Sequence, residues 1–446
     1  MKKFILVLLI AGGVEASLYD AGMWHLFFYP GARATAMAGA FTAYAGDATA
    51  PFYNPASISF IERRQFTAQN LRTSLFTEQL FGRLGAYYFG VSPDSVPGRP
   101  PWLGWEGMYH TFLGAVFPFR KGFSLAVWGS GFYEGTMEFE GKVWHPHDYN
   151  ISLTVSYRPF WRKRLPADMD FAVGATFKYL YSYVCPDDIL KEFLGVDTPG
   201  GSAWSPAFDL GFLIKGPADL VRGGLSLHNL FGRLKYLKGE GDTTVSIPRY
   251  IRYGLGARPL KLVDIRLPGG GLLTDFVDIT VNYDRMRDLL ESPHDIRESA
   301  GLELSLMRTF YLRWGRYREN GKTGSTRGMG LRIGPLSYDI SDQAQIYYNT
   351  EHSYVVTVSL VDPGKASSAR GWEKYLVNVL IPGTGNILEG DYLVGSALAI
   401  GGSLFYQGIT EGEKLKLVNY AGLGVTYLLS YGILLKVIKI PRFRRD

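Results

Sequence analysis

The 446-residue sequence contains a single cysteine, Cys185, which excludes an intramolecular disulfide and a cysteine-based zinc site. Charged residues are also scarce, at 20%. Aromatic residues reach 15%, with Tyr and Phe dominant, and glycine is abundant at 54. A chain rich in Tyr, Phe and Gly but poor in charge fits a sheet protein with an apolar outer surface. It fits a soluble enzyme less well and a disordered chain hardly at all.

Recognisable catalytic motifs are missing as well. There is no HExxH motif and no dinucleotide fingerprint, and Gly129-Ser130-Gly131 is not the Gly-x-Ser-x-Gly nucleophile elbow. The His145-Pro-His147-Asp148 run lies in a predicted loop without a compact partner cluster, so solvated loop residues are a better interpretation than metal ligands. We expect no enzyme activity, no cofactor and no metal; an enzyme with a scattered site stays open.

Positive charge is concentrated at one end of the chain. Residues 436–446 carry +4 of the net charge of +6, so the remainder of the sequence is nearly neutral. The high pI therefore reflects a basic tail and does not predict a nucleic-acid-binding face.

The first 16 residues have the pattern of an export signal. Lys2 and Lys3 precede an apolar run from Phe4 to Ile10, and small residues follow up to Ala16. This pattern predicts a signal peptide over 1–16 that is cleaved after Ala16. The alternative is a buried N-terminal strand.

The middle of the chain alternates between apolar and polar residues. In 151–158, Ile151, Leu153, Val155 and Tyr157 share one face, and polar residues occupy the other. Five further segments alternate in the same way: 172–183, 208–215, 277–283, 302–306 and 354–360. Transmembrane strands show lipid on one face and lumen on the other, although soluble sandwiches also alternate.

Two features favour a transmembrane barrel. Aromatic residues stand where strand ends are expected and would suit the membrane interface: Trp128, Tyr183, Tyr283, Trp314 and Tyr354. Connections also differ in length. Short ones are predicted near 76–78, 120–122, 216–219, 307–309 and 334–335, and long ones near 91–107, 136–148, 184–202, 231–248, 285–296 and 319–327.

These patterns predict an all-β fold, a transmembrane antiparallel β-barrel over residues 61–361. About fifteen candidate strands occur there, and a bacterial barrel requires an even number. Fourteen strands is the best value and sixteen is the alternative. We expect the lumenal polar residues to pair across the wall, including Arg158, Lys178, Asp209, Asp278 and Glu303.

The segment before the barrel, residues 17–60, contains GARATAMAGAFTAYAGDATAPFYNPAS over 31–57. Small residues dominate up to Ala45, and Pro55 forces an extended or turn geometry on Asn54. The stretch resembles the N-terminal region of the FadL-like outer-membrane family, and more closely its PorV/PorQ branch. The matching residues are Gly31, Ala32, Arg33, Met37, Ala38, Gly39, Ala40, Asp47, Ala48, Asn54, Pro55 and Ala56. Ala38 replaces a usual Gly.

The resemblance implies a fourteen-stranded outer-membrane barrel whose N-terminal segment plugs the lumen. FadL members pass hydrophobic small molecules, and PorV members serve type IX secretion by receiving exported proteins. The candidate plug or ligand-binding residues are Arg33, Phe41, Tyr44, Asp47, Phe52, Asn54 and Pro55. An apolar pocket is expected near Phe41, Tyr44 and Phe52. The alternative is a structural plug without a ligand role.

We therefore expect an outer-membrane channel or binding protein for hydrophobic small molecules. The alternatives are a secretion accessory that binds secreted or envelope proteins, and a structural envelope protein. Outer-membrane lipid is the expected surrounding, and no nucleic acid is expected as a partner.

Residues 362–446 extend beyond such a barrel. Two apolar runs, 392–406 and 417–440, are separated by the charged stretch 411–416 and followed by the basic tail. We predict a small helical hairpin on the periplasmic face of the outer membrane, with the tail at anionic head groups. A membrane-spanning pair and extra strands are the alternatives.

Overall fold

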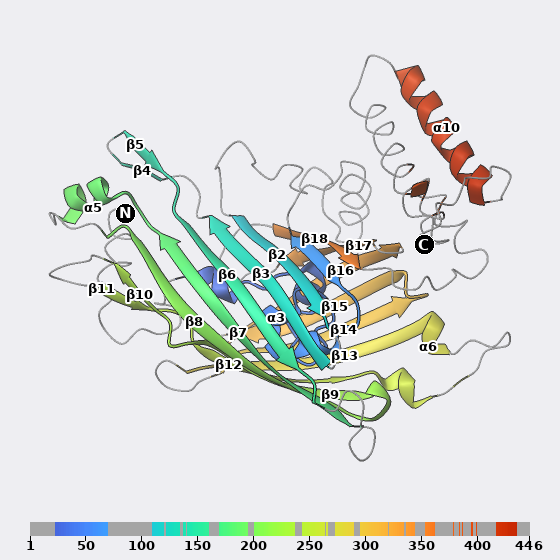
Figure 1. The fold of residues 1–446 in the computed structure, drawn as a ribbon, viewed down its shortest axis with the longest axis horizontal. Coiled ribbons are helices and arrows are strands. Elements are labelled where there is room, and N and C mark those ends of the chain that lie inside the picture. The colour runs from blue at the N-terminus through green and yellow to red at the C-terminus, as the bar shows by residue number, and fades with distance from the viewer. Residues whose placement is uncertain are drawn as a thin grey trace. The chain divides into compact units, whose positions relative to one another are not determined.

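In the computed structural model (Figure 1), the described residues form a barrel that encloses an N-terminal segment. They also include one helix near the C-terminus. The structure describes residues 23–69, 109–119, 122–133, 137–139, 141–159, 169–194, 200–236, 243–263, 265, 273–289, 295–319, 321–333, 336–343, 353–361, 378, 383, 386, 394–395, 398 and 416–434. The predicted signal peptide, 1–16, lies outside these residues, as does nearly all of the first C-terminal apolar run.

Fourteen antiparallel strands close into the barrel, which confirms the predicted fold class and strand number. Closure pairs the first strand with the last and removes exposed sheet edges. In chain order the strands are β1 (Gln65–Gln69), β2 (Tyr109–Pro118), β3 (Phe123–Tyr133), β6 (His147–Tyr157), β7 (Asp170–Tyr183), β8 (Ser202–Lys215), β9 (Val221–Leu230), β12 (Tyr250–Ala257), β13 (Val277–Asp288), β14 (Asp295–Leu306), β15 (Phe310–Glu319), β16 (Lys322–Ile333), β17 (Leu336–Gln343) and β18 (Ser353–Val361).

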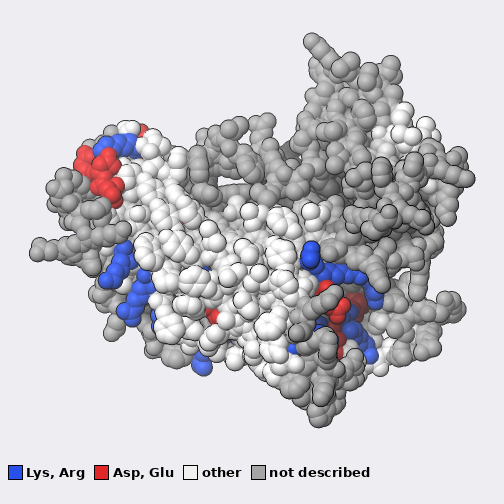
Figure 2. All heavy atoms as spheres, viewed as in Figure 1, with Lys and Arg blue, Asp and Glu red and all other residues white. Residues whose placement is uncertain are grey.

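Most strands present one face outward and one inward, as the alternation predicts, whereas residues 337–341 of β17 are all buried. In β6, Ile151 is 64% exposed on the outer face, whereas Ser152, Thr154 and Ser156 are buried inside. Figure 2 shows one broad face of the barrel that is almost free of charged side chains. An uncharged, apolar outer wall is the surface that lipid requires.

Outward aromatic rings form two bands on β3, β6, β7 and β8. At one end Tyr149 stacks on Tyr181, with ring centroids 5.0 Å apart. At the other end Phe123 lies 4.5 Å from Tyr157. On β6 the aliphatic residues Ile151, Leu153 and Val155 lie between them, whereas β7 and β8 place Phe177 and Phe208 at the level of Leu153. The order on β6, tyrosine then aliphatic then tyrosine, matches the interface, core and interface of a bilayer.

The predicted interfacial aromatics are only partly correct. Tyr183 ends β7 as expected, and His147, expected in a loop, begins β6 and packs on its ring. Trp128 was assigned wrongly, because it is only 2% exposed and faces the lumen. Tyr283 and Trp314 lie inside strands β13 and β15, away from their ends. The side chain of Tyr354 lies outside the described residues.

Short connections gather at one end of the barrel, here called the turn end. The predicted links near 120–122, 216–219, 307–309 and 334–335 join β2 to β3, β8 to β9, β14 to β15 and β16 to β17. The antiparallel order places all four at the same end. The predicted links at 76–78 and 91–107 lie outside the described residues.

Two predicted long connections at the opposite end, the loop end, are wrong. β15 and β16 are joined by residues 320–321 alone, and Gly321 has a φ of +76°. The 285–296 loop shrinks to 289–294, because β13 and β14 continue to Asp288 and from Asp295. The polar ends of these strands remain paired with their neighbouring strands beyond the apolar band. Because their composition resembles that of a loop, the sequence suggested longer connections.

Longer loop-end connections carry local structure. The β3–β6 link forms the hairpin of β4 (Met137–Phe139) and β5 (Lys142–Trp144). The β7–β8 link contains α5 (Asp187–Leu194), and the β9–β12 link forms the hairpin of β10 (Arg233–Tyr236) and β11 (Thr243–Ser246). At the turn end, η6 (Pro217–Asp219), η7 (Pro259–Leu262) and α6 (Leu273–Phe276) occupy the links after β8 and β12.

Residues 23–60 lie within the barrel lumen and are called the plug below; Figure 1 shows them in blue behind the strands. The plug contains η1 (Trp24–Phe27), α2 (Ala32–Ala36), α3 (Ala50–Tyr53) and η2 (Pro55–Phe60). Its many alanines allow four very short helices to pack closely, and most plug side chains are buried.

The second apolar run of the C-terminal module begins as helix α10 (Lys416–Leu434). The alternative of extra strands is therefore wrong for residues 416–434. Within the part of the chain that the structure describes, no helix has both the length and the apolarity to cross a membrane.

Candidate functional site in the plugged barrel lumen

Glycines on the inner wall allow the plug backbone to approach the barrel closely. A Cβ atom at Gly224 of β9 would lie 2.6 Å from the carbonyl oxygen of Thr42. One at Gly301 of β14 would lie 2.6 Å from the Cβ of Met37. Equivalent close approaches to plug atoms occur on six further strands, at Gly114, Gly174, Gly211, Gly256, Gly315 and Gly328. We call these eight residues the glycine belt. Only glycine lets two backbones meet at such distances.

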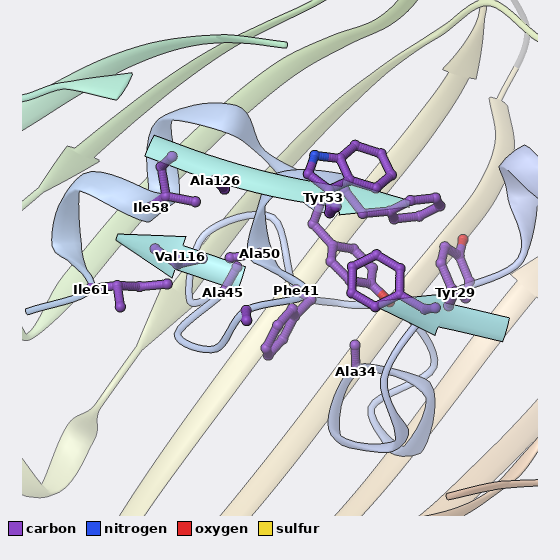
Figure 3. Close-up of a cluster of buried hydrophobic side chains, with 14 of the residues drawn as sticks. Tyr29, Ala34, Phe41, Ala45, Ala50, Tyr53, Ile58, Ile61, Val116 and Ala126 are labelled. Atoms are coloured by element: carbon purple, nitrogen blue, oxygen red, sulfur yellow. The ribbon is translucent and has the colours of Figure 1, made fainter. Parts of the chain in front are cut away.

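One side of the plug is apolar and aromatic. Phe41 and Phe52 meet the ring of Tyr53 edge to face, with centroids 5.1 and 5.2 Å apart. Phe52 also meets Trp128 of β3, which stacks on Phe112 of β2. Figure 3 shows this cluster, with Val116 and Ala126 contributed by the barrel wall. The wall of β2 and β3 is therefore lined with apolar groups inside the lumen, where a water-filled pore would be polar.

The opposite side of the plug is held by ions. Arg33 of α2 donates from Nε and Nη2 to the two carboxylate oxygens of Glu303, both at 2.7 Å. Glu303 also accepts from Arg313 at 2.6 Å, and Arg313 reaches Asp339 at 2.6 Å. Paired charges with this geometry satisfy one another away from water. The network ties the plug to β14, β15 and β17.

A second buried carboxylate anchors the next plug turn. Oδ2 of Asp284, on β13, accepts from the backbone N–H groups of Phe41 and Thr42, each at 2.9 Å. The Thr42 hydroxyl donates to the same oxygen at 2.6 Å. Arg252 of β12 lies 3.3 Å from it and donates to the carbonyl of Gly39 at 2.6 Å. Asp284 thus binds N–H groups of the plug backbone, and Arg252 binds one of its carbonyl groups.

Asn54 and Pro55 fix the plug at β7 and β8. Asn54 is extended, as the following proline predicts, and its side chain is fully buried. Its Nδ2 donates to the carbonyls of Phe212 and Thr42 at 3.0 and 3.2 Å, and its Oδ1 accepts from Ala56 N–H. The amide replaces hydrogen bonds that water would otherwise provide.

Asp47 and Tyr44 brace the plug at two further points. Oδ1 of Asp47 accepts from the backbone N–H of Thr49 at 2.9 Å, and Oδ2 lies 3.7 Å from Arg33. The Tyr44 hydroxyl donates to the carbonyl of Asp219 at the turn end, at 2.8 Å. Burial raises the pKa of Tyr44, so its phenol stays a neutral donor. Above the ring, the guanidinium of Arg222 lies 4.5 Å from its centroid.

The predicted lumenal wall residues do pair. Lys178 lies 2.7 Å from Asp209, and Arg158 lies 3.5 Å from Asp170. Asp278 pairs with Arg258, outside the lumenal plug contacts. Glu303 differs from the expectation of wall-to-wall pairing, because its second partner, Arg33, belongs to the plug.

Apolar contacts continue from the centre of the lumen towards the loop end. Met23 and Leu26, at the start of the plug, pack with residues of β7, β8, β10, β11 and the link after β11: Leu180, Ala203, Ala207, Leu234, Val245 and Ile247. Phe27 packs on Tyr250 and its neighbours, and Phe28 meets Phe132 edge to face at 5.0 Å. Apolar side chains are therefore packed at the loop end of the lumen as well as around Phe52.

The structure brings all seven predicted plug residues into the lumen. Phe41, Tyr44 and Phe52, around which a pocket was expected, are buried against protein groups. The sequence reasoning missed Arg252, Asp284, Arg313 and the glycine belt. The signal was present, because glycines and charged residues occupy the inward positions of the predicted strands.

No protein-family model matches the chain, and a search of curated proteins finds no relative. Among solved structures, the toluene transporter TbuX of Ralstonia pickettii is similar, with 13% identity, a TM-score of 0.40, and coverage of 74% of this chain and 98% of that one. A FadL homologue of Pseudomonas aeruginosa is 14% identical, with a TM-score of 0.39 and coverage of 74% and 97%. The CymD monoaromatic hydrocarbon channel is 11% identical, with a TM-score of 0.40 and coverage of 74% and 97%. At these scores the likeness carries no inference about the ligand of this chain.

Proposed function

We propose that this chain is an outer-membrane barrel that binds apolar small molecules at its loop end and passes them along the apolar side of its plug. The observation that supports this most is the two-sided plug. It meets β2 and β3 through aromatic rings and meets β12–β15 and β17 through buried ions and hydrogen bonds.

The two sides differ in how a ligand would affect them. An apolar ligand entering beside Phe52 or Trp128 replaces one apolar contact with another, so little free energy is lost. Entry on the other side would separate Glu303 from Arg33 and leave buried charges unpaired, at a cost of about 3–5 kcal/mol. The ligand route therefore follows the aromatic side, while the ionic side holds the plug.

In this proposal the predicted residues have two roles. Phe41 and Phe52 contact the ligand, and Tyr44 secures the turn-end side of the same cluster. Arg33, Asp47, Asn54 and Pro55 hold the plug in position. Because the glycine belt seats the plug closely, passage requires the aromatic side of the plug to move.

The secretion-accessory and structural alternatives stay predictions, because no contact among the described residues favours either of them.

The test uses intact cells whose lipopolysaccharide outer leaflet excludes the apolar dye N-phenyl-1-naphthylamine. We expect expression of the barrel to speed dye entry without admitting a hydrophilic chromogenic β-lactam, which reports leakage. A chain that leaves dye entry at the level of the empty vector would overturn the proposal.

A further inference from the structure

Helix α10 has an inverted distribution of polarity. The face that packs within the C-terminal module carries Thr426 and Ser430, which are 6% and 0% exposed. The outward face carries Val425, Leu428 and Leu429, which are 54%, 74% and 42% exposed. A helix on a water-soluble protein shows the opposite arrangement, with apolar residues inside.

The inner face of α10 takes part in a buried polar cluster. The hydroxyl of Ser430 lies 2.7 Å from Oδ1 of Asn378 and 2.6 Å from Oδ1 of Asn386. The backbone N–H of Gly383, in the Pro-Gly turn, donates to Ser430 at 2.7 Å and to Asn378 at 2.8 Å. Both asparagines are completely buried. Hydrogen bonds between small and polar residues are the contacts that hold helices together where the surroundings are lipid.

We propose that the C-terminal module is embedded in one leaflet of a lipid bilayer through the Val425, Leu428 and Leu429 face of α10. In lipid, the outward apolar side chains are removed from water, which is favourable. The polar groups of the inner face form hydrogen bonds with one another, as lipid surroundings require. The sequence adds charge complementarity, because Lys436, Lys439, Arg442, Arg444 and Arg445 follow the helix and suit anionic head groups.

The experiment places one fluorescent label on the full-length chain in vesicles that contain anionic lipid. In a Cys185→Ala background, Leu428→Cys carries an environment-sensitive dye. The label is then exposed to a doxyl quencher on lipid chains and to iodide in water. Ile151→Cys, on the outer wall of β6, is the lipid control, and Lys142→Cys, in the β4–β5 hairpin, is the aqueous control.

We expect the label at 428 to be quenched by the doxyl lipid as strongly as the label at 151, and not by iodide. Quenching by iodide, as at 142, would overturn the proposal. Oxidation of unlabelled Leu428→Cys chains to a covalent dimer, with neither quencher effective on the labelled chain, would assign the face to a second copy and also overturn it. If the label at 151 escaped the doxyl quencher, the membrane barrel itself would be in error, which separates that failure from one of the module.

Discussion

Replacing Gly224 with alanine should loosen the plug, whereas replacing its neighbour Gly223 should not. The two glycines are adjacent on β9 and face opposite sides of the wall. A Cβ at 224 would lie 2.6 Å from the carbonyl oxygen of Thr42 and 3.0 Å from Nδ2 of Asn54. A Cβ at 223 would meet only side-chain methyl groups of Ile214 and Leu255, at 3.2 and 3.6 Å.

The expected magnitude follows from these contacts. The added methyl must push Thr42 away, although Thr42 is tied to Asp284 through its N–H and hydroxyl. Overpacking of this kind costs about 1–3 kcal/mol, and weakening the Asn54–Thr42 hydrogen bond costs roughly 1 kcal/mol more. The lower flexibility of alanine does not enter, because β9 stays folded when the plug undocks. A net cost of about 2–4 kcal/mol increases the undocked fraction of the plug by roughly 30- to 800-fold.

Hydrogen–deuterium exchange of the detergent-solubilised protein measures this fraction directly. We expect peptides from residues 31–60 to exchange faster by that factor in Gly224→Ala and at the wild-type rate in Gly223→Ala. Peptides from β6 and β7 should keep their protection in both, since the barrel remains closed. Wild-type protection of the plug in Gly224→Ala would refute the argument that backbone contact with the glycine belt seats the plug.

Three other perturbations test the charges and the cysteine. Glu303→Gln should release Arg33 and lower the free energy of unfolding by about 3–5 kcal/mol. Glu298→Gln changes the same strand, but Glu298 pairs with Arg285 of β13 where the two side chains are 33% and 35% exposed, so the cost should be about 0–1 kcal/mol. Equal melting shifts of the two variants would contradict this. Burial opposes ionisation of Asp219, but its bond to Arg222 prevails and lowers the pKa of Asp219. The stability advantage over Asp219→Asn should therefore be full at neutral pH and shrink as the pH falls below about 4 in urea unfolding curves, and a pH-independent difference would count against it. Burial raises the pKa of the Cys185 thiol to about 11, so an aromatic disulfide reagent at pH 8 should react slowly with the native chain and quickly in denaturant, and rapid native reaction would show that the loop end opens.

The strands could be predicted from the sequence because lipid and lumen impose a strict period of two. The alternation of residues 151–157 gave β6 with its outward side chains in the correct phase. The same period would have placed Trp128 correctly, since Ala126, Trp128 and Ser130 share one inward face. Its position was inferred instead from the general preference of tryptophan for membrane interfaces, which is weaker evidence than phase along a strand.

Strand ends were less predictable, because polar residues beyond the apolar band still pair. Asn320-Gly321 is a two-residue hairpin signal between β15 and β16. The surrounding Arg, Glu, Lys and Thr residues nevertheless suggested a long loop. Composition therefore misled where turn chemistry would have helped.

The local geometry of the site was predictable, but its partners were not. The extended backbone of Asn54 follows from Pro55. The contact between Arg33 and Glu303 joins residues 270 positions apart, and it depends on the register of the strands between them and on how the plug is seated. No local pattern specifies which lumenal carboxylate meets which plug cation.

One pattern on the inner wall combines glycines that let the plug approach with buried charges. On four strands a belt or wall glycine stands two residues from a buried charge, and the period of two gives both the same inward face: Asp209 and Gly211, Arg252 and Gly254, Gly301 and Glu303, Arg313 and Gly315. The glycine removes the side chain that would keep the plug away. On β12 and β14 the charge binds the plug itself, because Arg252 donates to the carbonyl of Gly39 and Glu303 accepts from Arg33. The charges on β15 and β8 bind the wall instead, Arg313 at Glu303 and Asp209 at Lys178. The gap can also come from the neighbouring strand. Asp284 binds the plug from β13, which has no glycine, and Gly254 of β12 lies opposite it. An inward glycine beside an inward charge, on one strand or on two paired strands, is therefore a readable sequence sign of close contact between a plug and its wall.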